Sequence, residues 1–173
     1  MKKRNHKGFT LIELLIVVAI IGIIVAIAIP NLLNAIQRAK QKRTMGDMRT
    51  AGTAAEAYAV DFNHYPAAAG TYAPPAGLTI PPTVTFGAPG AAYPALNGQV
   101  VPTYIRVLPL TDGWASYFTY DAKGANRQDY VIWSNGKDGA SQATPAWGET
   151  TNFNDDIVFI DGQFVNYPAG AQN

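Results

Sequence analysis

A single carboxylate, that of Glu13, lies inside an apolar run that extends from Phe9 to Ile29. At a helical rise of about 1.5 Å per residue, this run would reach ~30 Å, which is enough to cross a bilayer. A carboxylate near the start of such a helix costs roughly 2.5–3.5 kcal/mol on insertion scales, so its presence indicates a function that retains it. The alternative is a single-pass anchor that tolerates a carboxylate near the membrane interface.

A second group of acidic residues brackets a polar loop in the C-terminal part of the chain. Asp138 precedes residues 140–154, and Asp155 and Asp156 follow them. Carboxylates that converge from both ends of one loop would repel each other unless a cation bound between them, and Ca²⁺ accepts roughly six to eight oxygen ligands. The spacing is not that of an EF-hand, because Ser134 would occupy the first ligand position. A solvated acidic turn explains the same residues at least as well.

The composition excludes several classes of site. The chain has no cysteine and only two histidines, which excludes disulfides and thiolate metal sites and removes most routes to zinc binding or Ser-His catalysis. Four basic residues and no acidic residue lie in the first eight positions, so the rest of the chain is net acidic. We therefore expect no nucleic-acid binding through a broad basic face. No nucleophile–base motif or phosphate-binding loop is present, and we do not expect an enzyme.

One long helix is expected to carry Glu13 into the membrane and to continue beyond it. Residues 9–29 predict a transmembrane half, and residues 30–63 predict an amphipathic half that ends before Pro66. The apolar stripe of the second half has helical spacing and comprises Met48, Ala51, Ala55, Tyr58 and Phe62. Pro30 lies inside this helix, where we expect a kink or a local loss of hydrogen bonding.

The acidic loop is expected to belong to a small β region. Residues 64–109 are rich in proline and glycine, and they predict an irregular, extended surface segment. Residues 110–173 form the predicted β region, with strands expected at 117–120, 130–133, 157–160 and 163–166. Asp161-Gly162 separates the last two strands and is a strong hairpin signal. The predicted fold is therefore α+β, a long N-terminal helix packed on a small C-terminal antiparallel sheet.

The N-terminal sequence Gly8-Phe9-Thr10-Leu11-Ile12-Glu13, which follows a basic stretch, resembles the class III signal of type IV prepilins and pseudopilins. The resemblance implies that residues 1–8 are a leader, removed after Gly8 by a prepilin peptidase that also methylates the new N-terminus. It also implies that in a filament the Phe9 amine of one subunit pairs with Glu13 of a neighbour. Either charge alone would be expensive in an apolar bundle, so this pairing would set the stagger between subunits. Family members loosen the helix near the position of Pro30 when they pack in a filament.

The stretch 104–164 is similar to the C-terminal region of the major pseudopilin of type II secretion systems. The matching positions are Tyr104-Ile105, Leu108-Pro109, Asp112, Trp114, Tyr120, Ser134, Gly136, Asp138-Gly139 and Asn154-Asp155-Asp156-Ile157. In that family the loop binds calcium. Carried over by position, the implied ligands are the side chains of Asp138, Asp155 and Asp156 and the carbonyls of Asn135 and Phe153.

The chain departs from this family pattern at three places. Gly113 and Ala115 replace the usual proline and glycine beside Trp114. The loop 140–154 is longer than is typical, and residues 66–103 replace a region that is often helical. These departures affect the assignment of the carbonyl ligands more than the assignment of the aspartates.

The resemblance implies a structural protein, a subunit of a periplasmic pseudopilus filament that supports type II secretion. Its expected partners are further copies of itself, minor pseudopilins, the prepilin peptidase and N-methyltransferase, an inner-membrane assembly platform and the lipid bilayer. The subunit is expected to cross the inner membrane once, with its C-terminal domain in the periplasm. After assembly it is expected to be part of a periplasmic filament. The alternative is a type IV pilin of surface fibres for adhesion or twitching motility. Many such pilins carry a C-terminal disulfide, which this chain cannot form.

Overall fold

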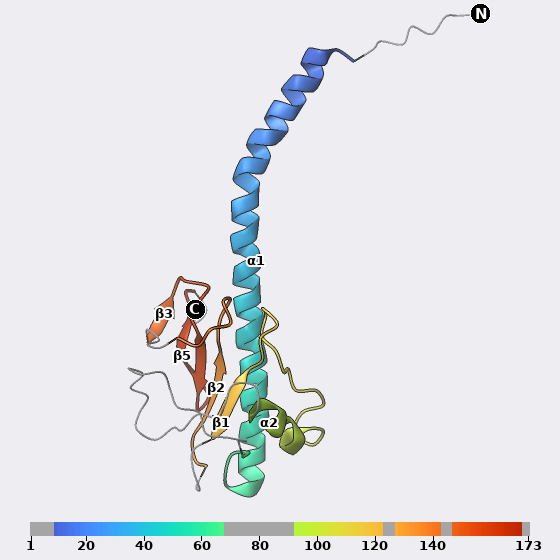
Figure 1. The fold of residues 1–173 in the computed structure, drawn as a ribbon. Coiled ribbons are helices and arrows are strands. Elements are labelled where there is room, and N and C mark those ends of the chain that lie inside the picture. The colour runs from blue at the N-terminus through green and yellow to red at the C-terminus, as the bar shows by residue number, and fades with distance from the viewer. Residues whose placement is uncertain (1–8, 68–91, 123–126, 143–146, 171–173) are drawn as a thin grey trace, which may run out of the picture. The chain divides into compact units, whose positions relative to one another are not determined.

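The computed structural model describes residues 9–67, 92–122, 127–142 and 147–170 (Figure 1). The chain divides into two compact units, Met1–Gln37 and Arg38–Asn173. One helix, α1 (Leu11–Phe62), contributes to both of them. The predicted leader 1–8, with Gly8, lies outside the described residues.

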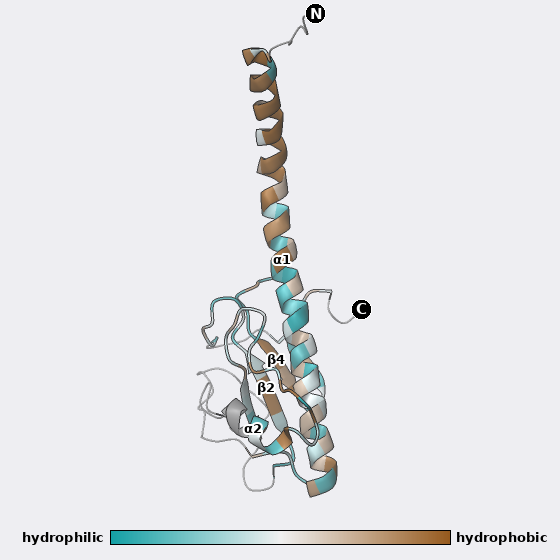
Figure 2. Ribbon diagram, turned by 90° about the vertical axis from the view of Figure 1, so that its right-hand side faces the viewer, coloured by the Kyte–Doolittle hydropathy of each residue, from teal (hydrophilic) through white to brown (hydrophobic). Residues whose placement is uncertain are grey.

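Among the described residues, the first unit contains the N-terminal part of α1, most of which is hydrophobic (Figure 2). Every leucine, isoleucine and valine side chain from Leu11 to Ile36 is at least 42% exposed. By length and composition this helix could span a membrane. It begins at Leu11 rather than at Phe9, and it continues as a helix through Pro30.

In the second unit, the rest of α1 packs one face against a small sheet. The buried helix residues Met48, Ala51 and Ala55 confirm the predicted stripe, and Tyr58 packs against the same core from a partly buried position. Phe62 is an exception, because it is 52% exposed and stacks on Tyr58 at the end of the helix. The helix ends one residue before the predicted end.

The sheet has five strands in the order β1-β2-β4-β5-β3. Their bounds are β1 (Thr119–Ala122), β2 (Tyr130–Ser134), β3 (Gly148–Thr150), β4 (Ile157–Ile160) and β5 (Gln163–Pro168). Neighbouring strands are antiparallel except for β3 and β5, which are parallel. Asp161 and Gly162 connect β4 to β5 with φ values of 45° and 85°, as expected of a two-residue hairpin turn.

The close packing of α1 on the sheet depends on Gly52. A Cβ at this position would lie 2.5 Å from the Phe159 ring and 2.7 Å from the Tyr130 hydroxyl. Tyr130 also donates a hydrogen bond to Glu56 of α1 at 2.8 Å. The helix can therefore approach β2 and β4 this closely only because residue 52 has no side chain.

Two predictions about the fold are wrong in part. The segment 64–109 is not irregular throughout, because it contains a helix, α2 (Ala92–Val100). Leu96 and Val100 lie one turn apart and are fully buried, so tertiary packing holds a helix that the surrounding prolines and glycines concealed. The loop 140–154 contains β3, whose parallel pairing with β5 makes the sheet mixed rather than antiparallel. A strand of three residues has too few positions to show an alternating pattern.

Candidate functional site

The first candidate site is the start of α1, where Thr10 and Glu13 form a capping box. The Thr10 backbone N–H and hydroxyl both donate to Glu13 Oε2, at 2.9 and 2.8 Å, and the Glu13 N–H donates to the Thr10 hydroxyl at 3.3 Å. This reciprocal arrangement satisfies two backbone donors that a helix start leaves unpaired. It also explains why the helix begins at Leu11.

The capping box gives Glu13 a partner within its own chain. Phe9 is 77% exposed and lies just before the box. The predicted pairing of Glu13 with the Phe9 amine of a neighbour would therefore have to replace or share the hydrogen bonds from Thr10. Sequence analysis missed the contribution of Thr10, although the spacing of a threonine and a glutamate three residues apart is the signature of this motif.

The second candidate site is the acidic loop, in which Asp156 is completely buried. Its Oδ2 accepts hydrogen bonds from the Trp133 indole N–H at 3.0 Å and from the Gln142 backbone N–H at 2.8 Å. Its Oδ1 is buried and has no hydrogen-bond partner among the described residues. Burial, with smaller contributions from the negative charges of Asp138 and Asp155, raises the pKa of Asp156 to about 7 against the lowering effect of the two hydrogen bonds.

Asp155 lies beside Asp156 but is held by uncharged donors. Its Oδ1 accepts from the side-chain amides of Gln142 at 2.6 Å and Asn152 at 2.8 Å, and its Oδ2 accepts from the Thr150 hydroxyl. Asp138 is exposed and accepts the Ala140 N–H at 2.9 Å. Within the described part of the chain, no three histidine or acidic side chains are arranged to hold a metal ion. The three predicted aspartates therefore share one neighbourhood without forming a cage.

The turn that begins at Asn135 lies directly against the residues before Asp156. The Lys137 N–H donates to the Phe153 carbonyl at 2.9 Å, so this predicted calcium ligand already has a partner. The Asn135 side-chain amide donates to the Gly139 carbonyl at 3.3 Å. Gly136 has a φ of 64°, and a Cβ there would lie 2.6 Å from the Asp155 carbonyl oxygen. Glycine is thus required for both the turn conformation and the close approach.

Asp112 supports this turn from the neighbouring loop. Its Oδ2 accepts a hydrogen bond from the Ser134 hydroxyl at 2.7 Å, and its Oδ1 accepts from the backbone N–H groups of Trp114 and Ser116, each at 2.9 Å. Ala115 lies inside that loop with a φ of 68°. Ala115 thus adopts a left-handed backbone conformation that glycine would adopt at a lower steric cost.

Some, but not all, of the oxygen atoms that a bound cation would need are available in this loop. Asp156 Oδ1 is a buried acceptor without a partner in the described part of the loop, and a cation could use it as a ligand. The oxygens of Asp155 and the Phe153 carbonyl are hydrogen-bonded instead. Binding of Ca²⁺ would therefore exchange several hydrogen bonds for metal contacts.

Two family models match successive parts of the chain. The family model described as the prokaryotic N-terminal methylation motif matches residues 3–29, and that of type II secretion system protein G matches residues 31–152. The type II secretion system core protein G of Klebsiella michiganensis is 30% identical over 139 residues, covering 80% of this chain and 89% of its own length. The protein of that name from Pseudomonas aeruginosa is 31% identical over 143 residues, covering 82% and 92%.

A pilin relative matches a shorter part of the chain. The type IV wide pilus major component PilA4 of Thermus thermophilus is 52% identical over 62 residues, which covers 36% of this chain and 47% of its own length. Identity is therefore higher with this pilin, but the similarity to the secretion proteins extends over most of both chains.

Proposed function

The chain belongs to the type II secretion system protein G family, and from this we propose that it acts as the structural subunit of a pseudopilus filament. The observation that carries this proposal is the exposure of apolar side chains all along α1 from Leu11 to Ile36. In water this surface would be unstable, since exposed apolar patches of this extent require a partner. Lipid before assembly and the helices of other subunits after assembly would both provide one.

The proposed pathway begins with removal of residues 1–8 and methylation of Phe9 by a prepilin peptidase. The subunit would then remain in the inner membrane, which α1 would cross once, and the unit 38–173 would lie in the periplasm. An assembly platform would add it to a filament that also contains minor pseudopilins. Glu13 would leave Thr10 to pair with the Phe9 amine of a neighbour, because an unpaired charge inside the bundle would be costly.

We propose also that the acidic loop binds Ca²⁺. The ligands would be the side chains of Asp138, Asp155 and Asp156 with the carbonyls of Asn135 and Phe153. The buried, unpartnered oxygen of Asp156 and the contact of the turn at Gly136 with residues 154–155 support this assignment. The bound cation would stabilise the loop by neutralising carboxylates that otherwise oppose each other's ionisation.

A deletion strain tests the function. Extracellular and periplasmic proteomes are compared with those of the parent, and surface fibres and twitching are scored in parallel. We expect secreted proteins to accumulate in the periplasm while surface fibres persist, with recovery by the intact chain expressed in trans. Intact secretion with loss of surface fibres or twitching would identify a type IV pilin and overturn the proposal.

A further inference from the structure

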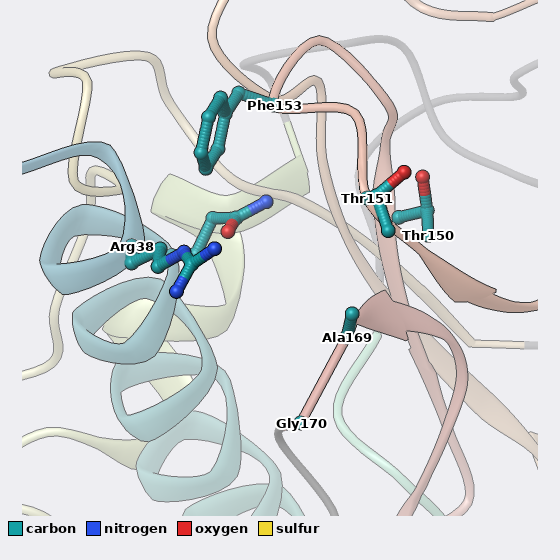
Figure 3. A pocket seen from close by; sticks show the side chains of 7 residues that line it. Arg38, Thr150, Thr151, Phe153, Ala169 and Gly170 are labelled. Atoms are coloured by element: carbon teal, nitrogen blue, oxygen red, sulfur yellow. The ribbon is translucent and has the colours of Figure 1, made fainter. Parts of the chain in front are cut away.

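A pocket of about 310 Å³ lies between the part of α1 just after Gln37 and the segment that follows β3 (Figure 3). Its walls are formed by Arg38 and Gln41 of α1, by Thr150, Thr151 and Phe153, and by the chain at 169–170. Figure 3 shows the Arg38 guanidinium, the Phe153 ring and the two threonines arranged around it. Glu13 and the three aspartates of the acidic loop do not line this space, although Thr150 and Phe153 border both the pocket and that loop.

Gln41 is the residue that marks this pocket as a binding site. Its side chain is only 4% exposed, and it has no hydrogen-bond partner within the described residues. Thr44, which lies one turn further along α1 and is also buried, donates to the Lys40 carbonyl at 2.9 Å. The Gln41 amide atoms are not among the fully enclosed polar atoms that lack a partner, so the amide reaches the open space of the pocket. This amide lines the pocket and can be satisfied from it.

Two further donors at the pocket are also unpaired. Arg38 is exposed and forms no ion pair among the described residues, whereas Arg43, five residues later, pairs with Asp47 at 3.4 Å. Thr151 is exposed and its hydroxyl has no hydrogen bond within the same part of the chain. The pocket thus presents a guanidinium, a primary amide and a hydroxyl, which together suit an anion with several oxygens.

The neighbouring carboxylates are engaged elsewhere. Glu149 accepts the Gly170 N–H at 2.8 Å, and Asp155 is held by Thr150, Gln142 and Asn152. Neither of them lines the pocket. An anion would therefore meet donors on its approach and would not displace an existing ion pair of Arg38.

The position of Arg38 along the chain indicates where such an anion would come from. Arg38 follows Ile36, the last of the exposed apolar side chains of α1, by two residues. Counted along the helix from Leu11, it lies about 40 Å away, which is close to the ~40–45 Å thickness of a bilayer with its headgroups. Arginine readily extends its charge toward phosphates at that depth.

We propose that this pocket binds the phosphate of a phospholipid headgroup, with Arg38, Gln41 and Thr151 as its donors. The inference rests on the membrane anchoring proposed above, but not on filament assembly or secretion. Headgroup binding would hold the unit 38–173 to the lipid surface until assembly removes the subunit from the membrane.

The test uses the full chain in dodecyl maltoside micelles and native mass spectrometry. Three probes are titrated: dihexanoyl-phosphatidylglycerol, dihexanoylglycerol with the same acyl chains and no phosphate, and inorganic phosphate. We expect the phospholipid to bind at least about tenfold more tightly than the phosphate-free lipid, since an arginine–phosphate contact contributes ~1.5–3 kcal/mol. Inorganic phosphate should compete only at much higher concentration.

Variants separate the pocket from general charge attraction. Arg38→Gln should weaken phospholipid binding about tenfold, and Thr151→Val about threefold. Lys42→Gln removes one positive charge at an exposed position outside the pocket and should change affinity less than about twofold. Gln41→Leu removes the third donor but changes a buried position, so it could disturb folding. Thr151 is exposed, so Thr151→Val leaves the core intact and tests the pocket in either case.

Several outcomes would overturn the inference. Equal losses in Arg38→Gln and Lys42→Gln would mean diffuse attraction rather than a site. Equal affinity for the two lipids would exclude phosphate recognition. Saturation by inorganic phosphate at the same concentration as the lipid would assign the pocket to free phosphate, and Arg38-dependent dimers without lipid would assign it to an acidic group of a second copy. None of these readouts depends on secretion, so failure here leaves the proposed function untouched.

Discussion

The Trp133 indole N–H donates to Asp156 Oδ2 at 3.0 Å, while the other carboxylate oxygen of Asp156 is buried without a partner among the residues that the structure describes. Trp133 lies in β2, next to its last residue, and Asp156 immediately precedes β4. The hydrogen bond therefore fixes the C-terminal end of the acidic loop to the sheet through one carboxylate oxygen and leaves the other available. This relationship makes Asp156 the residue on which the calcium proposal can be tested most sharply.

Calcium should raise the melting temperature of a chain lacking residues 1–34, which retains the compact unit Arg38–Asn173. At a hundredfold excess over the dissociation constant, linkage gives about 2.7 kcal/mol, or roughly 5–15 °C for a domain of this size. Asp156→Ala should abolish the shift. Thermal unfolding in calcium and in chelator measures it.

Asp121→Asn is the matched control for the calcium effect, because Asp121 is also buried but lies outside the loop. It should keep the full calcium shift. The calcium assignment would be contradicted if the unaltered chain melted at the same temperature in calcium and in chelator. It would also be contradicted if calcium shifted the melting temperatures of the unaltered chain and of Asp156→Ala equally.

Asp121 should make stability depend on pH. Burial raises its pKa from 3.8 to about 7, against a hydrogen bond from Ala122, and its Oδ2 has no partner within the described ranges of the chain. Between these values the folded chain binds more protons than the unfolded chain, so stability is highest at acid pH and falls as pH rises from about 4 to 7.

Asp121→Asn should reduce by up to about one the number of protons that the chain releases on unfolding between pH 4 and 7. It should also be more stable than the unaltered chain at pH 8, since a buried unpaired amide costs less free energy than a buried unpaired carboxylate. Urea unfolding in chelator at pH 5 and pH 8 measures both chains. Parallel pH profiles would show that Asp121 ionises normally in the fold.

Two glycines in α1 should respond to alanine in opposite directions. Gly52→Ala should destabilise the fold by about 1–3 kcal/mol, because its Cβ would meet Phe159 and Tyr130. Gly46→Ala should stabilise it by about 0.5–1 kcal/mol, because position 46 is exposed and nothing lies within 4 Å. Chemical denaturation of the two variants measures both effects, and a loss of stability in both would contradict this account of Gly52.

The sequence allowed correct prediction of the features that depend on local pattern. The stripe at Met48, Ala51 and Ala55 predicted the packed face of α1, and Asp161-Gly162 predicted the hairpin between β4 and β5. The helix α2 and the strand β3 could not be predicted, since both are held by tertiary contacts that no local pattern records. In the candidate sites, the sequence indicated Glu13 and Asp156 but not their partners Thr10 and Trp133, because a partner depends on which residues the fold brings together.

Ala115→Gly should raise stability by about 0.5–1 kcal/mol. Ala115 has a φ of 68°, where glycine avoids the steric cost that an alanine bears, and Asp112 holds this loop in place. Ala39→Gly, at an exposed helical position, should instead lower stability by about 1 kcal/mol. Denaturation curves of both variants check the difference in sign, and a loss of stability in Ala115→Gly would contradict it.

Glu13→Ala should block filament assembly while leaving membrane insertion intact. Loss of the carboxylate would leave the Phe9 amine of a neighbour unpaired in an apolar bundle, at a cost of about 3–5 kcal/mol per subunit. Thr10→Val removes the hydroxyl of the capping box but keeps the charge, and should cost only about 1 kcal/mol. Filament yield and membrane fractionation of the three chains separate these roles. Equal yields for Glu13→Ala and the unaltered chain would contradict the pairing.

A cryo-electron microscopy reconstruction of filaments assembled from the processed chain tests the central claim most directly. The account predicts that the α1 helices form the filament core, with each Glu13 carboxylate within about 4 Å of the Phe9 amine of a neighbouring subunit. A core in which Glu13 remains bonded only to its own Thr10, with every neighbouring amine out of reach, would contradict it.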